Sequence, residues 1–217
     1  MNTRRPIATV LEPAEDPLLV DLETAKEELG ISPDDTTQDR RLSRYLAQAT
    51  SQIHEFCGRV FPLQAYRNVF AAYPHGYYRC DALQTAEFPI TEVIGIGDAG
   101  IALTEDQWRV DAPRGLIWRV SSAPVTMPWA ASEIVVDFWA GFPTIPAVVE
   151  AAALRLVRWN QGMRGWDADA PRDPMLRSRE GSTYGRIEWF GNYTPGLEGG
   201  LPQEVAQMLH PYVRTFV

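Results

Sequence analysis

The chain has 217 residues, enough for one domain that buries a core of its own. Its 28 acidic and 20 basic residues give a net charge of -8, which argues against a broad DNA-binding surface, because such surfaces neutralise phosphates with Lys and Arg. Two cysteines are too few for a disulfide framework, and no apolar run reaches the roughly 18 residues that a membrane helix needs. We therefore expect a protein of a reducing compartment, made in the cytoplasm and without a membrane contact.

The N-terminal part of the chain predicts an arm followed by two helices. The first 17 residues show no periodicity and are expected to form an extended arm. Apolar residues then recur every three or four positions over 21–29 and 38–57, which indicates two amphipathic helices. Gly30 and Gly58 follow them and can adopt the left-handed conformation that ends a helix. Neither apolar stripe carries a catalytic group, so both are interpreted as packing surfaces.

From about residue 59 to residue 142 the pattern changes to short runs rich in β-branched and aromatic residues, separated by turn signals. The runs expected to be strands are 66–70, 92–96, 107–110, 116–120 and 134–139. We interpret this segment as an antiparallel β meander or small barrel inserted in a helical frame.

Helical periodicity returns over residues 144–165, where a proline suits the first turn. The next segment, 166–200, is rich in glycine, aspartate and aromatic residues and predicts a long irregular loop with one hairpin around residues 186–190. A loop of this length inside a compact domain is usually functional or ordered by a partner.

A last helix is predicted over residues 201–213, beginning at Pro202. Because Pro211 cannot continue a helix, we expect residues 211–217 to leave as an extended tail. The whole pattern predicts an α+β fold in one domain, 1–217, in which a small helical bundle carries the β-rich insertion. The segments of this helical frame are 18–58, 144–165 and 201–213.

The sequence contains no motif that predicts catalysis or a bound cofactor. A zinc site of His54, Cys57, His75 and Cys80 is conceivable, but the tight Cys-x-x-Cys spacing of zinc knuckles is absent. There is no Gly-x-Ser-x-Gly elbow and no phosphate-cradling glycine loop. Three aspartates, Asp167, Asp169 and Asp173, do not match the pattern of a calcium loop. Two carboxylate pairs, Asp81 with Glu87 and Glu133 with Asp137, could in principle do acid-base work, but with 28 acidic side chains some pairs lie near one another by chance. We therefore expect no metal, no cofactor, no catalytic residue and no enzymatic activity.

Six segments, in a fixed order, carry a likeness to a known family. They are Leu22 to Lys26 with Leu29, Phe56 to Phe61, Phe88 to Val93, Ile134 to Phe142, Ile145 to Ala152, and Gly200 to Val205 with Leu209, Pro211 and Tyr212. With these segments the chain resembles, over about residues 18–213, the head-to-tail connector (adaptor) proteins of tailed bacteriophages and gene transfer agents. The loop from Trp166 to Tyr193 is richer in aromatic residues than this family leads us to expect.

The resemblance implies a structural protein of the virion neck, assembled in the host cytoplasm and without catalytic residues. It implies a homo-oligomeric ring of roughly twelve copies below the portal vertex, in which one face of each subunit meets a different face of the next. The partners implied are the portal protein, a downstream neck or tail protein, and DNA as a weakly contacted polymer in transit.

We expect the C-terminal segment to bind the portal, because a weak contact repeated around a ring becomes an avid one. The residues expected at the portal are Leu201, Val205, Met208, Leu209, Tyr212, Phe216 and Val217. The alternative for the helix residues among them is that they complete the chain's own bundle. Two aromatic residues of the long loop, Trp189 and Phe190, are expected to contact the portal or a neighbouring subunit.

Other functions compatible with the sequence are head closure, tail completion, or a bacterial scaffold of no viral origin. An enzyme would instead require a pocket where carboxylates, or His54 and Cys57, converge with perturbed pKa values. For the ring, the excess of acidic residues suggests a lumen that repels the phosphate backbone and lets DNA pass without sticking.

Overall fold

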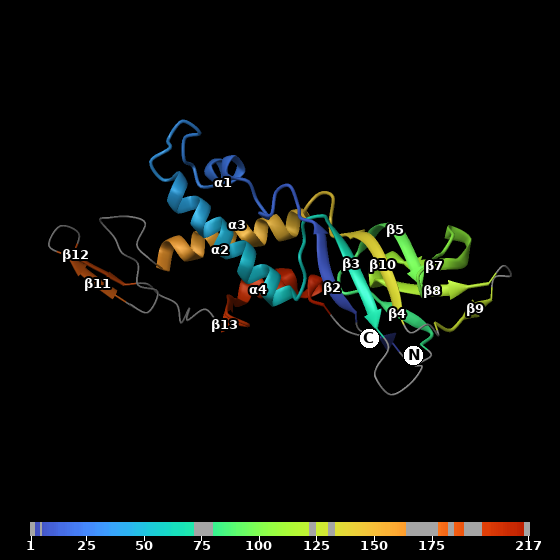
Figure 1. Ribbon diagram of the computed structural model, residues 1–217. Helices are drawn as coiled ribbons and strands as arrows, with labels where there is room; N and C mark the ends of the chain where they lie inside the picture. Colours follow the sequence, from blue (N-terminus) through green and yellow to red (C-terminus); the bar gives the residue numbers. More distant parts are fainter. Residues whose placement is uncertain are drawn as a thin grey trace. The chain divides into compact units, whose positions relative to one another are not determined.

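The computed structural model describes residues 3–4, 6–71, 80–121, 125–129, 133–163, 178–181, 185–188 and 197–214. The chain divides into two compact units. The β unit contains residues 1–17 and 59–144, and the helical unit contains residues 18–58 and 145–217. The described part holds four α-helices and mostly antiparallel sheets, which confirms the α+β class (Figure 1).

Two five-stranded sheets form the β unit. The first sheet has the order β2 (Ile7–Glu12), β3 (Gln64–Ala71), β10 (Glu133–Ala140), β5 (Ile90–Asp98) and β6 (Ile101–Ala102). The second has the order β1 (Thr3–Arg4), β4 (Ala82–Gln84), β8 (Leu116–Val120) and β7 (Trp108–Asp111), with β9 (Thr126–Met127) also paired to β8. Two short 3-10 turns, η1 (Glu105–Gln107) and η2 (Ala112–Arg114), flank β7.

The centre of the first sheet is β10, which pairs with β3 along its whole length and with β5 on its other side. Its side chains alternate, so that Ile134, Val136 and Phe138 are buried. They join Leu83 and Ile117 of the second sheet in one core. Burial on one face of a strand is what an alternating apolar pattern predicts.

Two expectations for the β-rich part are corrected. Of the two expected forms, a meander would place consecutive strands side by side, whereas β10 lies between β3 and β5, and β1 pairs with β4 in parallel; the small barrel stays a prediction. The N-terminal arm is also part of the sheet, because β2 forms an antiparallel pair with β3. The five predicted runs correspond to β3, β5, β7, β8 and β10, with ends that differ by two residues or fewer, whereas the shorter β4, β6 and β9 were not predicted.

One position of the β unit requires glycine because two segments of the chain approach closely there. Gly141 follows β10 with a φ of 114°, a conformation that residues with a side chain rarely adopt. A Cβ atom at this position would lie 2.6 Å from the carbonyl oxygen of Pro62. The segment before β3 and the end of β10 can therefore meet only because this residue has no side chain.

The helical unit is built on α1 (Leu22–Glu28), α2 (Asp39–Cys57), α3 (Ala147–Met163) and α4 (Gln203–Leu209). In it α2 packs against α1, α3 and α4 (Figure 1). Gly30 and Gly58 have φ values of 70° and 64°, as predicted for the residues that end α1 and α2. The unit also contains the short hairpins β11 (Ser178–Gly181) with β12 (Gly185–Glu188) and β13 (Leu197–Glu198) with β14 (Leu201–Pro202), and the 3-10 turn η3 (His210–Tyr212).

Candidate assembly surfaces

The residues weighed for metal binding or catalysis do not form a site in the described part of the chain. Cys57 is buried in the helical unit and Cys80 in the β unit, while His75 lies outside the described residues. His54 is half-buried on α2, and this burial lowers its pKa to about 4. Across the described ranges no three His, Cys, Asp or Glu side chains are grouped to hold a metal ion.

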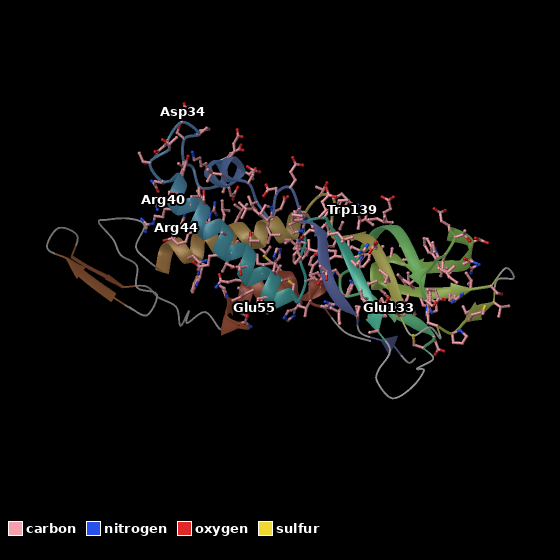
Figure 2. All side chains as sticks on the ribbon, viewed as in Figure 1. Asp34, Arg40, Arg44, Glu55, Glu133 and Trp139 are labelled. Atoms are coloured by element: carbon pink, nitrogen blue, oxygen red, sulfur yellow. The ribbon has the colours of Figure 1, made fainter. Side chains whose placement is uncertain are left out.

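Of the acidic residues singled out in the sequence, Asp81, Glu87, Glu133 and Asp137 belong to the β unit, while Asp167, Asp169 and Asp173 lie outside the described residues. On β10, Asp137 binds Arg67 of β3 through two hydrogen bonds of 2.8 and 2.6 Å, while Glu133 is exposed (Figure 2). Asp81 is exposed as well. None of the helices that the structure describes is long and apolar enough to span a bilayer.

Most of the predicted portal-binding residues of the C-terminal helix are buried within the helical unit. Leu201 of β14 exposes 1% of its surface, and Val205 and Leu209 expose 2% or less, because α4 packs against α2 and α3. An ion pair between Glu204 of α4 and Arg155 of α3 adds to this contact. These three side chains therefore complete the chain's own bundle, and a partner can reach them only if α4 leaves it.

The half-buried members of the same set are Met208 and Tyr212. Instead of leaving as an extended tail after Pro211, the chain forms η3 and returns to the end of α2. There the backbone N–H of Arg214 donates a hydrogen bond of 2.8 Å to the carbonyl of Cys57. The other predicted contact residues, Phe216, Val217, Trp189 and Phe190, lie outside the described residues.

The sequence analysis missed an apolar surface on the first sheet. All six residues of β2 are exposed, and Ile7, Val10 and Leu11 expose 69%, 48% and 45% of their surface. This strand also lies at the edge of the sheet, where one row of backbone groups has no strand beside it in the described part. Such an edge is a template for pairing with another chain.

The opposite edge of the same sheet is apolar too. Ile101 of β6 and Ile94 of β5 expose 70% and 54% of their surface. Beside them, Gly95 and Gly97 pair with Asp137 and Val135 on the face turned away from the core. A Cβ atom at either glycine would meet nothing within 4 Å, so packing inside the described chain does not require them.

A buried ion pair fixes the start of α2 against α1. The Lys26 ammonium lies 2.5 Å from Oδ1 of Asp39 and donates a hydrogen bond of 3.2 Å to the carbonyl of Pro33. The Lys26 side chain is 6% exposed. Since an isolated helix as short as α1 is unstable in water, this pair and the burial of Ala25 hold α1 in place.

The comparisons with known proteins concern one part of the sequence and the fold. A family model described as the phage gp6-like head-tail connector protein matches residues 20–78, which include α1, α2 and β3. This match confirms, for that part of the chain, the resemblance inferred from the sequence. None of the curated proteins matches the chain.

Two solved structures share the fold. A chain in the neck of an empty GTA particle, computed with C6 symmetry, has a TM-score of 0.57 and 16% identity, with 97% of both chains covered. A chain in the virion of a native gene transfer agent (GTA) particle has a TM-score of 0.52 and 19% identity, covering 76% of this chain and 88% of that one.

Proposed function

We propose that this chain is a head-tail connector protein, which forms a ring in the neck of a phage or gene transfer agent particle and links the filled head to the tail. The observation that carries the proposal is the match of residues 20–78 to the head-tail connector family. Support comes from the fold, which resembles that of a neck protein along 97% of its length.

The exposed edges of the first sheet suit a protein that works in contact with other chains. Ile7, Val10 and Leu11 at one edge and Ile94 and Ile101 at the other are apolar and exposed. Exposed apolar groups gathered in this way mark interaction sites on soluble proteins. Two different edges on one molecule are compatible with the head-to-tail contacts that close a ring.

We propose that the ring attaches to the portal through the C-terminal segment. Of the residues predicted for this contact, Met208, Tyr212, Phe216 and Val217 carry the proposal, because Leu201, Val205 and Leu209 are used inside the helical unit. Repetition around the ring makes such a small contact avid. Trp189 and Phe190 are proposed to contact the portal or a neighbouring subunit.

DNA is proposed to pass through the ring with weak contact, on its way to a downstream neck or tail protein. The net charge of -8 supports this, since carboxylates facing a channel repel the phosphate backbone. A map in which basic side chains line the channel would contradict this part of the proposal.

Removal of residues 215–217 tests the attachment. This truncation keeps the hydrogen bond between Arg214 and Cys57, which a truncation at residue 211 would remove. We expect a folded protein that no longer binds DNA-filled heads carrying the portal, measured by sedimentation with heads and by electron microscopy. A Gln203→Ala variant, changed at an exposed position of α4, is the matched control and should attach normally.

Two results would overturn the proposals. Normal attachment of the truncated chain would refute the C-terminal contact, and absence of the protein from the necks of intact particles would refute the connector function. A neck map that places the ring away from the portal would instead favour a head-closure or tail-completion protein.

A further inference from the structure

Two helices of the helical unit carry pairs of like charges on exposed surface. In α1, Glu23 and Glu27 are four residues apart, and in α2, Arg40 and Arg44 have the same spacing. All four side chains are exposed, and Figure 2 shows Arg40 and Arg44 near the start of α2. Residues four apart on a helix lie side by side, so each pair concentrates charge of one sign at one place.

Neither pair has an ion-pair partner within the described part of the chain. The ion pairs that the helical unit forms there include Lys26 with Asp39, Arg158 with Glu28, and Arg155 with Glu204. Like charges at this spacing destabilise a helix slightly. Arg40 also lies in the first turn of α2, at the positive end of the helix dipole, which disfavours cations. The local electrostatics of both helices would therefore improve if an opposite charge from outside approached each pair.

We propose that Glu23 and Glu27 of one copy bind Arg40 and Arg44 of the next copy in the ring. The two pairs have opposite charge and the same spacing along their helices, so two ion pairs can form in register. The contact is heterologous, because α1 of one copy meets α2 of its neighbour, and such contacts close into rings. This inference rests on the proposed connector function.

DNA is the other anion that an exposed arginine pair such as Arg40 and Arg44 can bind. The chain's net charge of -8 disfavours a nucleic-acid surface here, and the complementary carboxylates are present on the same chain. A second copy is therefore the occupant that the charges favour.

Charge reversal of each pair tests the contact in solution. The acidic variant Arg40→Glu/Arg44→Glu has a net charge of -8 - 4 = -12, and the basic variant Glu23→Arg/Glu27→Arg has a net charge of -8 + 4 = -4. Self-association is measured by sedimentation velocity, with circular dichroism to verify the fold. We expect each variant to associate at least about tenfold more weakly than the wild type, because exposed charge pairs contribute modestly and reversal adds repulsion.

Mixing the two variants is the decisive step. In a 1:1 mixture every α1–α2 contact joins opposite charges again, so we expect association to return in rings with alternating subunits. The variant with all four reversals should likewise associate as the wild type does, and it matches the wild type in net charge. The neutral variants Arg40→Gln/Arg44→Gln and Glu23→Gln/Glu27→Gln keep the test valid if a reversal unfolds α1, and each should weaken association. Raising the salt concentration should weaken the wild-type contact, since exposed charges are screened.

Several results would overturn the inference. The inference fails if both variants associate as the wild type does, or if their mixture stays dissociated. It also fails if the wild-type chain stays monomeric at millimolar concentration, or if the acidic variant differs from the wild type only in that it no longer binds duplex DNA. If particles carrying the acidic variant still show a normal ring in the neck, the inference fails and the connector function stands. Absence of any ring from wild-type particles would refute the function itself.

Discussion

Replacing Lys26 by Met tests whether the buried ion pair holds α1 on α2. Methionine keeps the apolar stem of the side chain but removes the ammonium, which lies 2.5 Å from Asp39. Removing one partner of a fully buried pair costs about 3 to 5 kcal/mol, because the other charge is left uncompensated. Asp39 is 30% exposed, so water can solvate part of its charge and the loss is smaller.

The carbonyl of Pro33 also loses its donor, which adds about 1 kcal/mol. For Lys26→Met we therefore expect the free energy of unfolding to fall by about 2 to 3 kcal/mol, measured by urea denaturation. In a double-mutant cycle with Asp39→Asn, the coupling energy should exceed about 1 kcal/mol. A loss below about 0.5 kcal/mol for Lys26→Met, or additive effects of the two changes, would refute the reasoning.

Two further predictions concern single residues. Burial lowers the pKa of His54 from 6.5 to about 4 in the folded protein. As the pH falls, the unfolded chain therefore binds a proton at His54 before the folded chain does. The free energy of unfolding is undiminished by this effect above pH 6.5 and decreases as the pH drops towards 4. Allowing for its partial exposure, this loss is about 1 to 3 kcal/mol, and urea denaturation at pH 7.5 and pH 4 should show it reduced in His54→Gln; an equal loss in both proteins would contradict the prediction. Gly141→Ala should lower the unfolding free energy by more than about 2 kcal/mol, because its Cβ would lie 2.6 Å from the Pro62 oxygen, while Gly95→Ala should stay within about 1 kcal/mol of the wild type. Thermal denaturation compares the two alanine variants. Similar melting temperatures would show that a side chain at residue 141 is tolerated, which contradicts the prediction.

The local elements could be predicted because their signals are local. Apolar spacing and a following glycine define α2 and its end at Gly58, and a run of β-branched and aromatic residues defines β10. The order of the strands could not be predicted in this way. The ion pair of Arg67 with Asp137 joins residues 70 positions apart, and no local pattern specifies such a pairing.

The strand β2 was missed for a different reason. Alternation of apolar and polar residues indicates a strand with one buried face, whereas all six residues of β2 are exposed. The apolar stripe of the predicted last helix raised the opposite problem: it predicts that Leu201, Val205 and Leu209 are buried but not which surface buries them. The sequence therefore favoured the portal, with the chain's own bundle as the alternative, and in the structure these three residues are buried within the helical unit.

The interleaving of the two units has a consequence for biosynthesis. The ribosome makes β1 and β2 first, yet their partners β4 and β3 begin at residues 82 and 64, and the central strand β10 ends only at residue 140. The helical unit is interrupted in turn and is completed by α4, which ends at residue 209. Neither unit can complete its fold until most of its residues have left the ribosome. We therefore expect slow folding, and a nascent chain that depends on chaperones to protect its unpaired strands.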